Sequence, residues 1–156
     1  MPGEPVLIAG AGIAGLALAL ALARRGIASR VLERRDELSE AGAGIQLGPN
    51  AMHVLARLGV AARLEPEAGR PAAIQVHDGG SGHRLATLPL GDAMAAQFGA
   101  PYRVAHRADL QAALVGAVHD APAIALITGF DVAAWEETDG GVRVRSAAGP
   151  SENGAA

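Results

Sequence analysis

Cysteine is absent from the 156-residue sequence, and only 3% of its residues are aromatic. The absence of cysteine excludes disulfides, thiolate metal ligands and a thiol nucleophile, and it fits a cytoplasmic location. The five histidines show no spacing typical of ligands on one helix, so we predict no metal site. The formal net charge of -3 provides no basic excess for nucleic acid or for an anionic membrane surface.

Long hydrophobic runs are also missing. The most apolar stretch, Leu16 to Ala23, is too short to span a bilayer, and the residues before it lack the cationic segment of a signal peptide. Half of the residues are nonetheless hydrophobic and 19% are charged, as in a globular domain with one sizeable core. We therefore expect one folded domain over residues 1–146 and a flexible tail rich in small residues over 147–156.

The first 33 residues predict a strand, a helix and a second strand. Pro5–Ala9 is a continuous apolar run, typical of a parallel strand buried on both faces. A glycine-rich turn leads into Leu16–Arg25, whose alanines and leucines predict a helix that ends before Gly26. The second strand is predicted over Ile27–Glu33. Because such crossovers are right-handed, the two strands should be parallel neighbours.

The rest of the sequence alternates turn signals with short apolar segments. Extended segments are predicted at Gly42–Leu47, Ala72–His77, His83–Leu88, Ile124–Ile127, Val132–Glu136 and Val142–Arg145. Helices are predicted at Pro49–Leu58, ended by Gly59, and at Ala108–Val118. Glycine-rich turns at 78–82 and 139–141 predict two hairpins. The expected fold class is α/β, a Rossmann-type unit with a parallel sheet plus antiparallel hairpins.

The turn after the first strand has the spacing Gly10-x-Gly12-x-x-Gly15. In this motif the first glycine permits the tight turn, the second lets a pyrophosphate approach the backbone, and the third allows the helix to pack closely on the strand. The helix start offers free N–H groups and a positive dipole end to phosphates. Glu33 closes the second strand, where an acidic side chain would bind the adenosine ribose. This combination predicts dinucleotide binding rather than a purely structural glycine turn.

Glu33 also bears on the choice of nucleotide. A carboxylate at this position favours NAD or FAD over NADP, because it would repel a 2′-phosphate. Arg34 and Arg35 follow it directly, and arginines there could instead accept a phosphate. A solvated surface pair is the alternative interpretation of the two arginines.

Four segments extend the pattern beyond the glycine turn: "GAGIAGLALALALARRG", "RVLERR", "GAGIQLGPNAMHVLARLG" and "HRADLQAAL". With these segments in this order, the chain resembles the FAD-dependent aromatic-ring monooxygenases, and within them the salicylate hydroxylase-like group with the p-hydroxybenzoate hydroxylase fold. The resemblance runs from Val6 to about Arg145. It implies FAD as the cofactor. For a complete enzyme it implies hydroxylation of an aromatic small molecule with NAD(P)H and O2.

The resemblance also implies which residues bind FAD. Along the pyrophosphate it implies Gly10, Gly12, Ala14 and Gly15. Glu33 would bind the adenosine ribose, with Arg34 beside the adenine end. Gln46 would lie near the cofactor and Arg107 would contact it, while the backbone near Val132 would border the adenine.

The residues themselves leave alternatives open at several of these positions. Arg107 precedes an amphipathic helix whose first turn Asp109 can serve, and from the residues alone an ordinary surface arginine is the favoured interpretation. Gln46 and Asn50 fit equally well as a polar group at a strand edge and as a residue of a helix turn. His106 is expected to be structural.

Members of the family continue well beyond this length, with later "DG" and "GD" segments that complete the flavin site. Asp78-Gly79 and Asp139-Gly140 lie in predicted hairpin turns and do not correspond to these segments. We therefore expect a truncated chain in which 72–104 contributes to an incomplete substrate-side sheet. We also expect no nameable catalytic acid or base, and exposed edges that favour self-association.

Activity of the isolated chain is accordingly not expected. The alternative to an FAD-binding part of a monooxygenase is a non-catalytic nucleotide-binding fragment or module. An NAD-dependent oxidoreductase is a third interpretation, and the "HRADL" segment argues against it.

Overall fold

The structure is a computed structural model that describes residues 4–38 and 42–155. It divides into two compact units, one within Met1–Glu40 and Gln111–Ala156 and the other within Ala41–Leu110. The sequence predicted a single folded stretch over 1–146. In the structure, the second unit is inserted between the two parts of the first, so the first unit is discontinuous in sequence.

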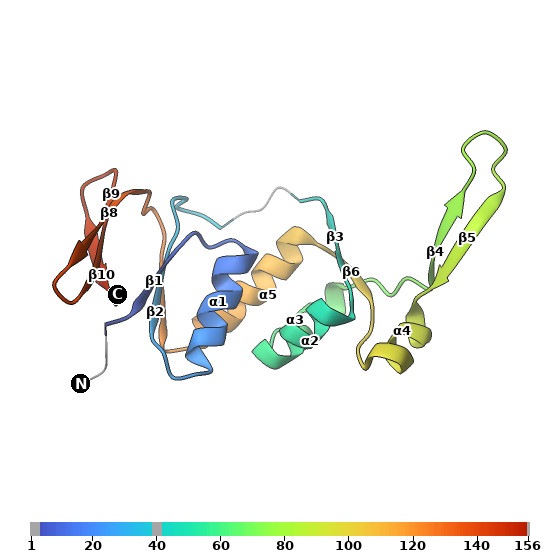
Figure 1. The fold of residues 1–156 in the computed structure, drawn as a ribbon, viewed down its shortest axis with the longest axis horizontal. Coiled ribbons are helices and arrows are strands. Elements are labelled where there is room, and N and C mark those ends of the chain that lie inside the picture. The colour runs from blue at the N-terminus through green and yellow to red at the C-terminus, as the bar shows by residue number, and fades with distance from the viewer. Residues whose placement is uncertain (1–3, 39–41, 156) are drawn as a thin grey trace. The chain divides into compact units, whose positions relative to one another are not determined.

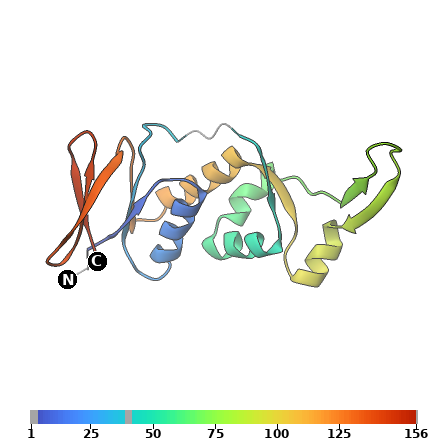
Figure 2. The same ribbon diagram turned by 45° about the horizontal axis from the view of Figure 1, so that its top comes forward.

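The first unit is built on a parallel sheet of order β1-β2-β7. Its strands are β1 (Val6–Ala9), β2 (Ser29–Leu32) and β7 (Ile124–Ile127). Helix α1 (Ile13–Ala23) connects β1 to β2, and Figures 1 and 2 show α5 (Arg107–His119) running beside it. The parallel pairing of the first two strands confirms the predicted crossover unit.

Helix α1 begins three residues earlier than the sequence predicted, at Ile13, and ends at Ala23. Gly12 is its extended N-cap residue, so the third glycine of the motif already lies in the first turn of the helix. At the other end the chain leaves the helix through Gly26, which has a φ of 73°. Such a left-handed conformation carries no steric cost for glycine, as expected after a helix end.

A second, antiparallel sheet of order β10-β9-β8 completes the first unit. Its strands are β8 (Val132–Thr138), β9 (Gly141–Ser146) and β10 (Ser151–Gly154). The predicted hairpin of β8 and β9 is confirmed. An apolar cluster joins residues of both sheets, and it consists of Leu32, Phe130 and Val144 with Leu7, Ile127 and Val132 packed against them.

The prediction of a flexible tail over 147–156 was wrong where the chain forms β10. This strand pairs with β9, and Glu152 forms an ion pair with Arg30 of β2. Gly154 packs so tightly that an added Cβ would lie 2.5 Å from Cγ of Leu7. The composition of the segment is that of a loop, but an edge strand takes its stability from backbone hydrogen bonds to the neighbouring strand, here β9, which composition does not reveal.

The second unit combines a short antiparallel pair with several helical segments. The pair consists of β3 (Gly44–Leu47) and β6 (Arg103–His106). The helical segments are α2 (Pro49–Leu58), α3 (Ala61–Leu64), the 3-10 helix η1 (Glu65–Glu67) and α4 (Gly91–Phe98). Both ends of α2 agree with the prediction, because Pro49 starts it and Gly59 ends it with a φ of 78°. Four elements were not predicted from the sequence because they are too short to show a clear period: α3, η1, α4 and β6.

A hairpin of β4 (Ala73–His77) and β5 (Arg84–Pro89) also belongs to the second unit and confirms the prediction. Ile74 pairs with Leu88 across the hairpin, so the two side chains share one face. Both are substantially exposed, with 38% and 50% of their surface accessible. The hairpin thus has an apolar face that lies open to solvent.

Candidate functional site

The carboxyl ends of the parallel strands meet at one edge of the first unit. There the N–H of Gly10 donates to the carbonyl of Leu32 at 2.7 Å, and the N–H of Glu33 donates to the carbonyl of Ile127 at 2.8 Å. The first bond holds the glycine turn beside the end of β2, and the second holds the end of β2 beside β7. Ligands of open α/β sheets bind outside this edge, so it is the first place to search for a site.

The three motif glycines have different structural roles in the turn. Gly10 has a φ of 95°, which favours glycine. An added Cβ at Gly15 would lie 2.0 Å from the carbonyl oxygen of Gly10, so this position has no space for a side chain. At Gly12 an added Cβ would meet nothing within 4 Å. Gly15 is therefore required for packing, whereas Gly12 leaves open space in front of the helix start.

Glu33 links the turn to the end of β2 through its side chain. Its Oε2 accepts the N–H of Ala11 at 2.7 Å, and its Oε1 accepts the N–H of Arg35 at 3.1 Å. The residue is only 9% exposed. Because a carboxylate accepts about four hydrogen bonds, both oxygens retain capacity for a ligand's hydroxyl groups.

Two adjoining cavities of about 200 and 190 Å³ lie at this edge, and they share Glu33 and Arg34. The first is lined by Ala9, Gly10, Leu32, Glu33, Arg34, Phe130, Asp131 and Val132. The second is lined by Gly12, Glu33, Arg34, Arg35, Leu38 and Gln111. One hollow therefore faces the ends of the strands, and the other faces the start of α1.

Several of the sequence-predicted residues come together here. Gly10, Glu33, Arg34 and Val132 line the first cavity although Val132 is far away in the sequence. Ala14 lies exposed in the first turn of α1. The ligand-binding roles of these residues stay predictions.

Two other predicted residues lie in the second unit. Gln46 is on β3, where its Oε1 accepts the hydroxyl proton of Tyr102 at 2.7 Å. Arg107 is the first residue of α5, and its N–H donates to the carbonyl of Ala43 at 3.2 Å. Their predicted contacts with a cofactor likewise stay predictions.

Gln111 is an additional residue of the site that was not predicted from the sequence. Its side chain is buried, with 5% of the surface exposed, and its Nε2 donates to the carbonyl of Ala11 at 3.1 Å. A signal was present, because Gln111 shares a helix face with Leu114 and Val118, which are apolar and buried. A polar residue at an apolar position of an amphipathic helix indicates a specific hydrogen bond.

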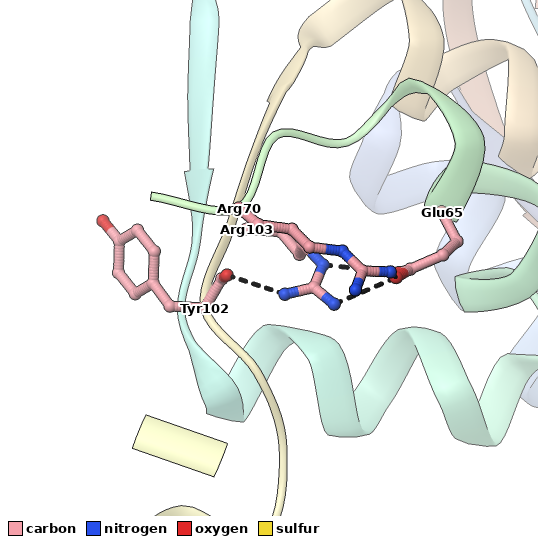
Figure 3. A network of polar contacts seen from close by, with 4 residues as sticks. All are labelled: Glu65, Arg70, Tyr102 and Arg103. Atoms are coloured by element: carbon pink, nitrogen blue, oxygen red, sulfur yellow. Dashed lines mark hydrogen bonds and ion pairs between the residues drawn. The ribbon is translucent and has the colours of Figure 1, made fainter. Parts of the chain in front are cut away.

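The second unit contains a separate polar network (Figure 3). Arg103, almost buried on β6, donates to Glu65 of η1 through Nη2 at 2.9 Å and through Nε at 3.3 Å. Its Nη1 donates to the carbonyl of Tyr102 at 3.1 Å, and Arg70 adds a further ion pair to Glu65. The paired geometry is the strong form of an arginine–carboxylate contact. The network ties η1 to β6.

The hydrogen bond from Arg103 is the largest influence on the pKa of Glu65 and lowers it below its ordinary value. Desolvation acts in the opposite direction, and the charges of Arg103 and Arg70 add to the lowering. A largely apolar cavity of about 390 Å³ borders this ion pair and is also lined by residues such as Met52 and Ala56. Glu65 is therefore held as a carboxylate paired with an arginine. That pairing fits a structural role better than acid–base chemistry.

His106 also has a structural surrounding. An added Cβ at Gly42 would lie 2.2 Å from Nδ1 of His106, so the ring packs directly against that glycine. In the described part of the chain, no group of three or more His, Asp or Glu side chains is arranged to hold a metal ion. Over the same residues, no helix combines the length and apolar character needed to cross a membrane.

A family model described as "FAD binding domain" matches residues 4–153. Among curated proteins, 3-hydroxybenzoate 6-hydroxylase of Polaromonas naphthalenivorans is 39% identical over 152 residues, which are 97% of this chain and 38% of that protein. 3-hydroxybenzoate 6-hydroxylase 1 of Aquipseudomonas alcaligenes is 43% identical over 136 residues, which are 84% of this chain and 33% of that protein. The chain thus spans about a third of the length of these relatives.

The fold is shared with solved structures. The crystal structure of Klebsiella pneumoniae HpxO in complex with FAD and uric acid matches 99% of this chain and 38% of that chain, with a TM-score of 0.86 and 28% sequence identity. The match covers both units of the present structure.

Proposed function

The chain belongs to the FAD binding domain family, and from that premise we propose that it supplies the adenosine-binding part of a monooxygenase. The proposed reaction of the whole protein is hydroxylation of an aromatic compound with NAD(P)H and O2, in the cytoplasm. The substrate class follows from the relatives, which are named as hydroxylases of 3-hydroxybenzoate. Because the chain spans only part of their length, activity and substrate are proposals for the whole protein.

The observation that carries the binding proposal is the buried Glu33 carboxylate between two cavities at the strand ends. Its position suits the two adjacent hydroxyl groups of an adenosine ribose, which donate hydrogen bonds to a carboxylate. On one side lies the cavity that Val132 lines, which suits the adenine. On the other side lies the cavity that Gly12 lines, which suits the pyrophosphate.

The start of helix α1 also fits a dinucleotide. The N-cap of α1 has no side-chain hydrogen bond, and the first turn of the helix contains no acidic residue. The helix start therefore keeps N–H groups and a positive dipole end for an anionic ligand. Gly12 leaves room for phosphate oxygens to approach the backbone, because nothing lies within 4 Å of the position of a Cβ.

When bound, the flavin supplies the redox and oxygen chemistry. In the proposed function, this chain's own residues bind and orient the adenosine half. Glu33 accepts the ribose hydroxyls and at the same time holds the Ala11 end of the turn. Arg34, which lines both cavities, is proposed to serve the adenine end. The proposed cofactor contacts of Gln46 and Arg107, two residues of the second unit, complete the set.

The test is calorimetric titration of the protein with FAD, ADP and NAD. We expect FAD and ADP to bind, and NAD to bind more weakly than FAD. Glu33→Ala should weaken FAD and ADP binding by roughly 1.5–3 kcal/mol, as for loss of a hydrogen bond to a charged group. Glu137→Ala, which removes an exposed carboxylate of β8, is the matched control and should bind normally.

Unchanged affinity of Glu33→Ala for FAD would contradict the assignment of Glu33 as the ribose ligand. Absence of any FAD or ADP binding by the unmodified protein would contradict the proposed function itself. Oxidation of NAD(P)H in the presence of hydroxybenzoate then separates a monooxygenase from a nucleotide-binding module without turnover.

A further inference from the structure

Ala11, the residue between the first two glycines of the turn, is completely buried. Both of its peptide groups are bound by side chains from other elements. Its N–H donates to Oε2 of Glu33 at 2.7 Å, and its carbonyl accepts from Nε2 of Gln111 at 3.1 Å. The turn is therefore held from two sides, by the end of β2 and by α5.

The burial of Gln111 needs an explanation beyond packing. Its neighbours on the same face of α5, Leu114 and Val118, are apolar. Transfer of an amide into such surroundings is unfavourable unless it makes a hydrogen bond, and an aliphatic side chain would fill the space without that cost. Among the residues that the structure describes, the hydrogen bond of this amide goes to the glycine turn. That bond is therefore the feature that distinguishes glutamine from an aliphatic residue here.

The bond to Ala11 has a consequence for Gly12. In a planar trans peptide, the carbonyl of one residue and the N–H of the next point in opposite directions. When Gln111 holds the Ala11 carbonyl, it also fixes the direction of the Gly12 N–H, which stands at the start of α1. Gly12 and Gln111 line the same cavity, the one we assign to the pyrophosphate.

We propose that Gln111 is a positioning residue for the phosphate-binding turn, acting through the Ala11 carbonyl to orient the Gly12 N–H toward the pyrophosphate of a dinucleotide. This inference rests on the proposed function. It separates two roles at the site, because Glu33 bonds to the turn and lies at the proposed ribose position, whereas Gln111 bonds to the turn and lines only the cavity that we assign to the pyrophosphate. Gln111 therefore affects only ligands that carry phosphate.

The test compares Gln111→Met with the unmodified protein in calorimetric titrations with FAD, ADP and adenosine. Methionine has a similar length but no donor, so the turn loses its hold on the Ala11 carbonyl. We expect FAD and ADP to bind about 5- to 10-fold more weakly, in line with the loss of one hydrogen bond. Adenosine, titrated in competition with ADP, should bind within about twofold of the unmodified protein because it has no phosphate.

Gln97→Met is the matched control, since it removes an exposed amide from α4 and should leave all three affinities unchanged. Should Gln111→Met fail to fold, Gln111→Leu is a second variant that lacks the donor without adding a charge, and it should produce the same ligand pattern. Equal losses for adenosine, ADP and FAD would overturn the proposal, because they indicate general damage to the fold. Unchanged FAD and ADP affinities would overturn it as well.

The outcomes also distinguish this inference from the function on which it rests. If the unmodified protein binds neither FAD nor ADP, the proposed function fails. If it binds both and Gln111→Met does so equally well, only the positioning role fails.

Discussion

The two units of this protein differ in the burial of their side chains: the first buries polar site residues, and the second exposes apolar residues of a hairpin. In the first unit, Glu33 and Gln111 are buried, and each side chain has defined backbone partners. In the second unit, the β4–β5 hairpin forms where its turn residues and alternating pattern predict it, yet Leu88 and its pair Ile74 are exposed. Turn residues and alternation suffice to form a hairpin, but they do not determine what covers it.

The largest effect is expected where the first unit is packed most tightly. Gly15→Ala places a Cβ 2.0 Å from the carbonyl oxygen of Gly10, a backbone atom that cannot rotate away. We expect the free energy of unfolding to fall by about 4 kcal/mol or more, at the upper end of overpacking effects. Urea denaturation followed by circular dichroism measures the change.

Two other glycines serve as controls for this result. Gly12→Ala meets nothing within 4 Å, so the fold should lose no more than about 1 kcal/mol, while FAD binding weakens because the Cβ enters the space we assign to phosphate. Gly140→Ala, in the hairpin turn between β8 and β9, also has free space and should change neither quantity. A fully stable Gly15→Ala protein would contradict the close packing of α1 on the turn.

A second comparison replaces one leucine in each unit. Leu16 on α1 is completely buried, whereas Leu88 on β5 is half exposed. Leu16→Ala should lower the free energy of unfolding by about 3 kcal/mol, because it removes buried methyl groups and leaves a cavity. Leu88→Ala should change it by less than about 0.5 kcal/mol. Equal losses would show that the hairpin face is covered in solution, for example by self-association.

The smallest effect concerns the polar network of the second unit and depends on pH. Glu65→Gln removes the charge that pairs with Arg103, and we expect a loss of about 1–2 kcal/mol at neutral pH. Because the folded protein lowers the pKa of Glu65 from its ordinary 4.5, this stabilisation is fully present above that value. It disappears as the pH falls through the lower pKa of the folded state.

Denaturation of the two proteins at pH 7 and at pH 3 measures the effect, and the difference between them should narrow at the lower pH. Glu67→Gln, an exposed neighbour in η1, is the control. A difference that is the same at both pH values would mean that the charge of Glu65 does not stabilise the fold.

Much of the fold followed from the sequence where the signals are local. Pro49 and Gly59 predicted both ends of α2, and the strand, glycine turn and helix at the N-terminus predicted the parallel pairing of β1 and β2. The fate of 147–156 was missed, because β10 depends on pairing with β9 rather than on its own composition. The candidate site differs in the same way between local and distant signals. Glu33 was predicted from its spacing to the glycines, whereas Gln111, about 80 residues further along the chain, was not predicted.

By itself, the sequence determined the glycine turn, the acidic residue that closes β2 and the family to which these motifs point. These features depend on the conformational freedom of glycine and on the order of residues within about 30 positions, so they are visible in the sequence alone. Only the tertiary structure decided that Gln111 reaches Ala11 across 100 residues and that Glu152 pairs with Arg30 across 122. Contacts at such separations arise from the packing of whole elements. Many residues contribute to the free energy of that packing, so no local motif predicts the contacts.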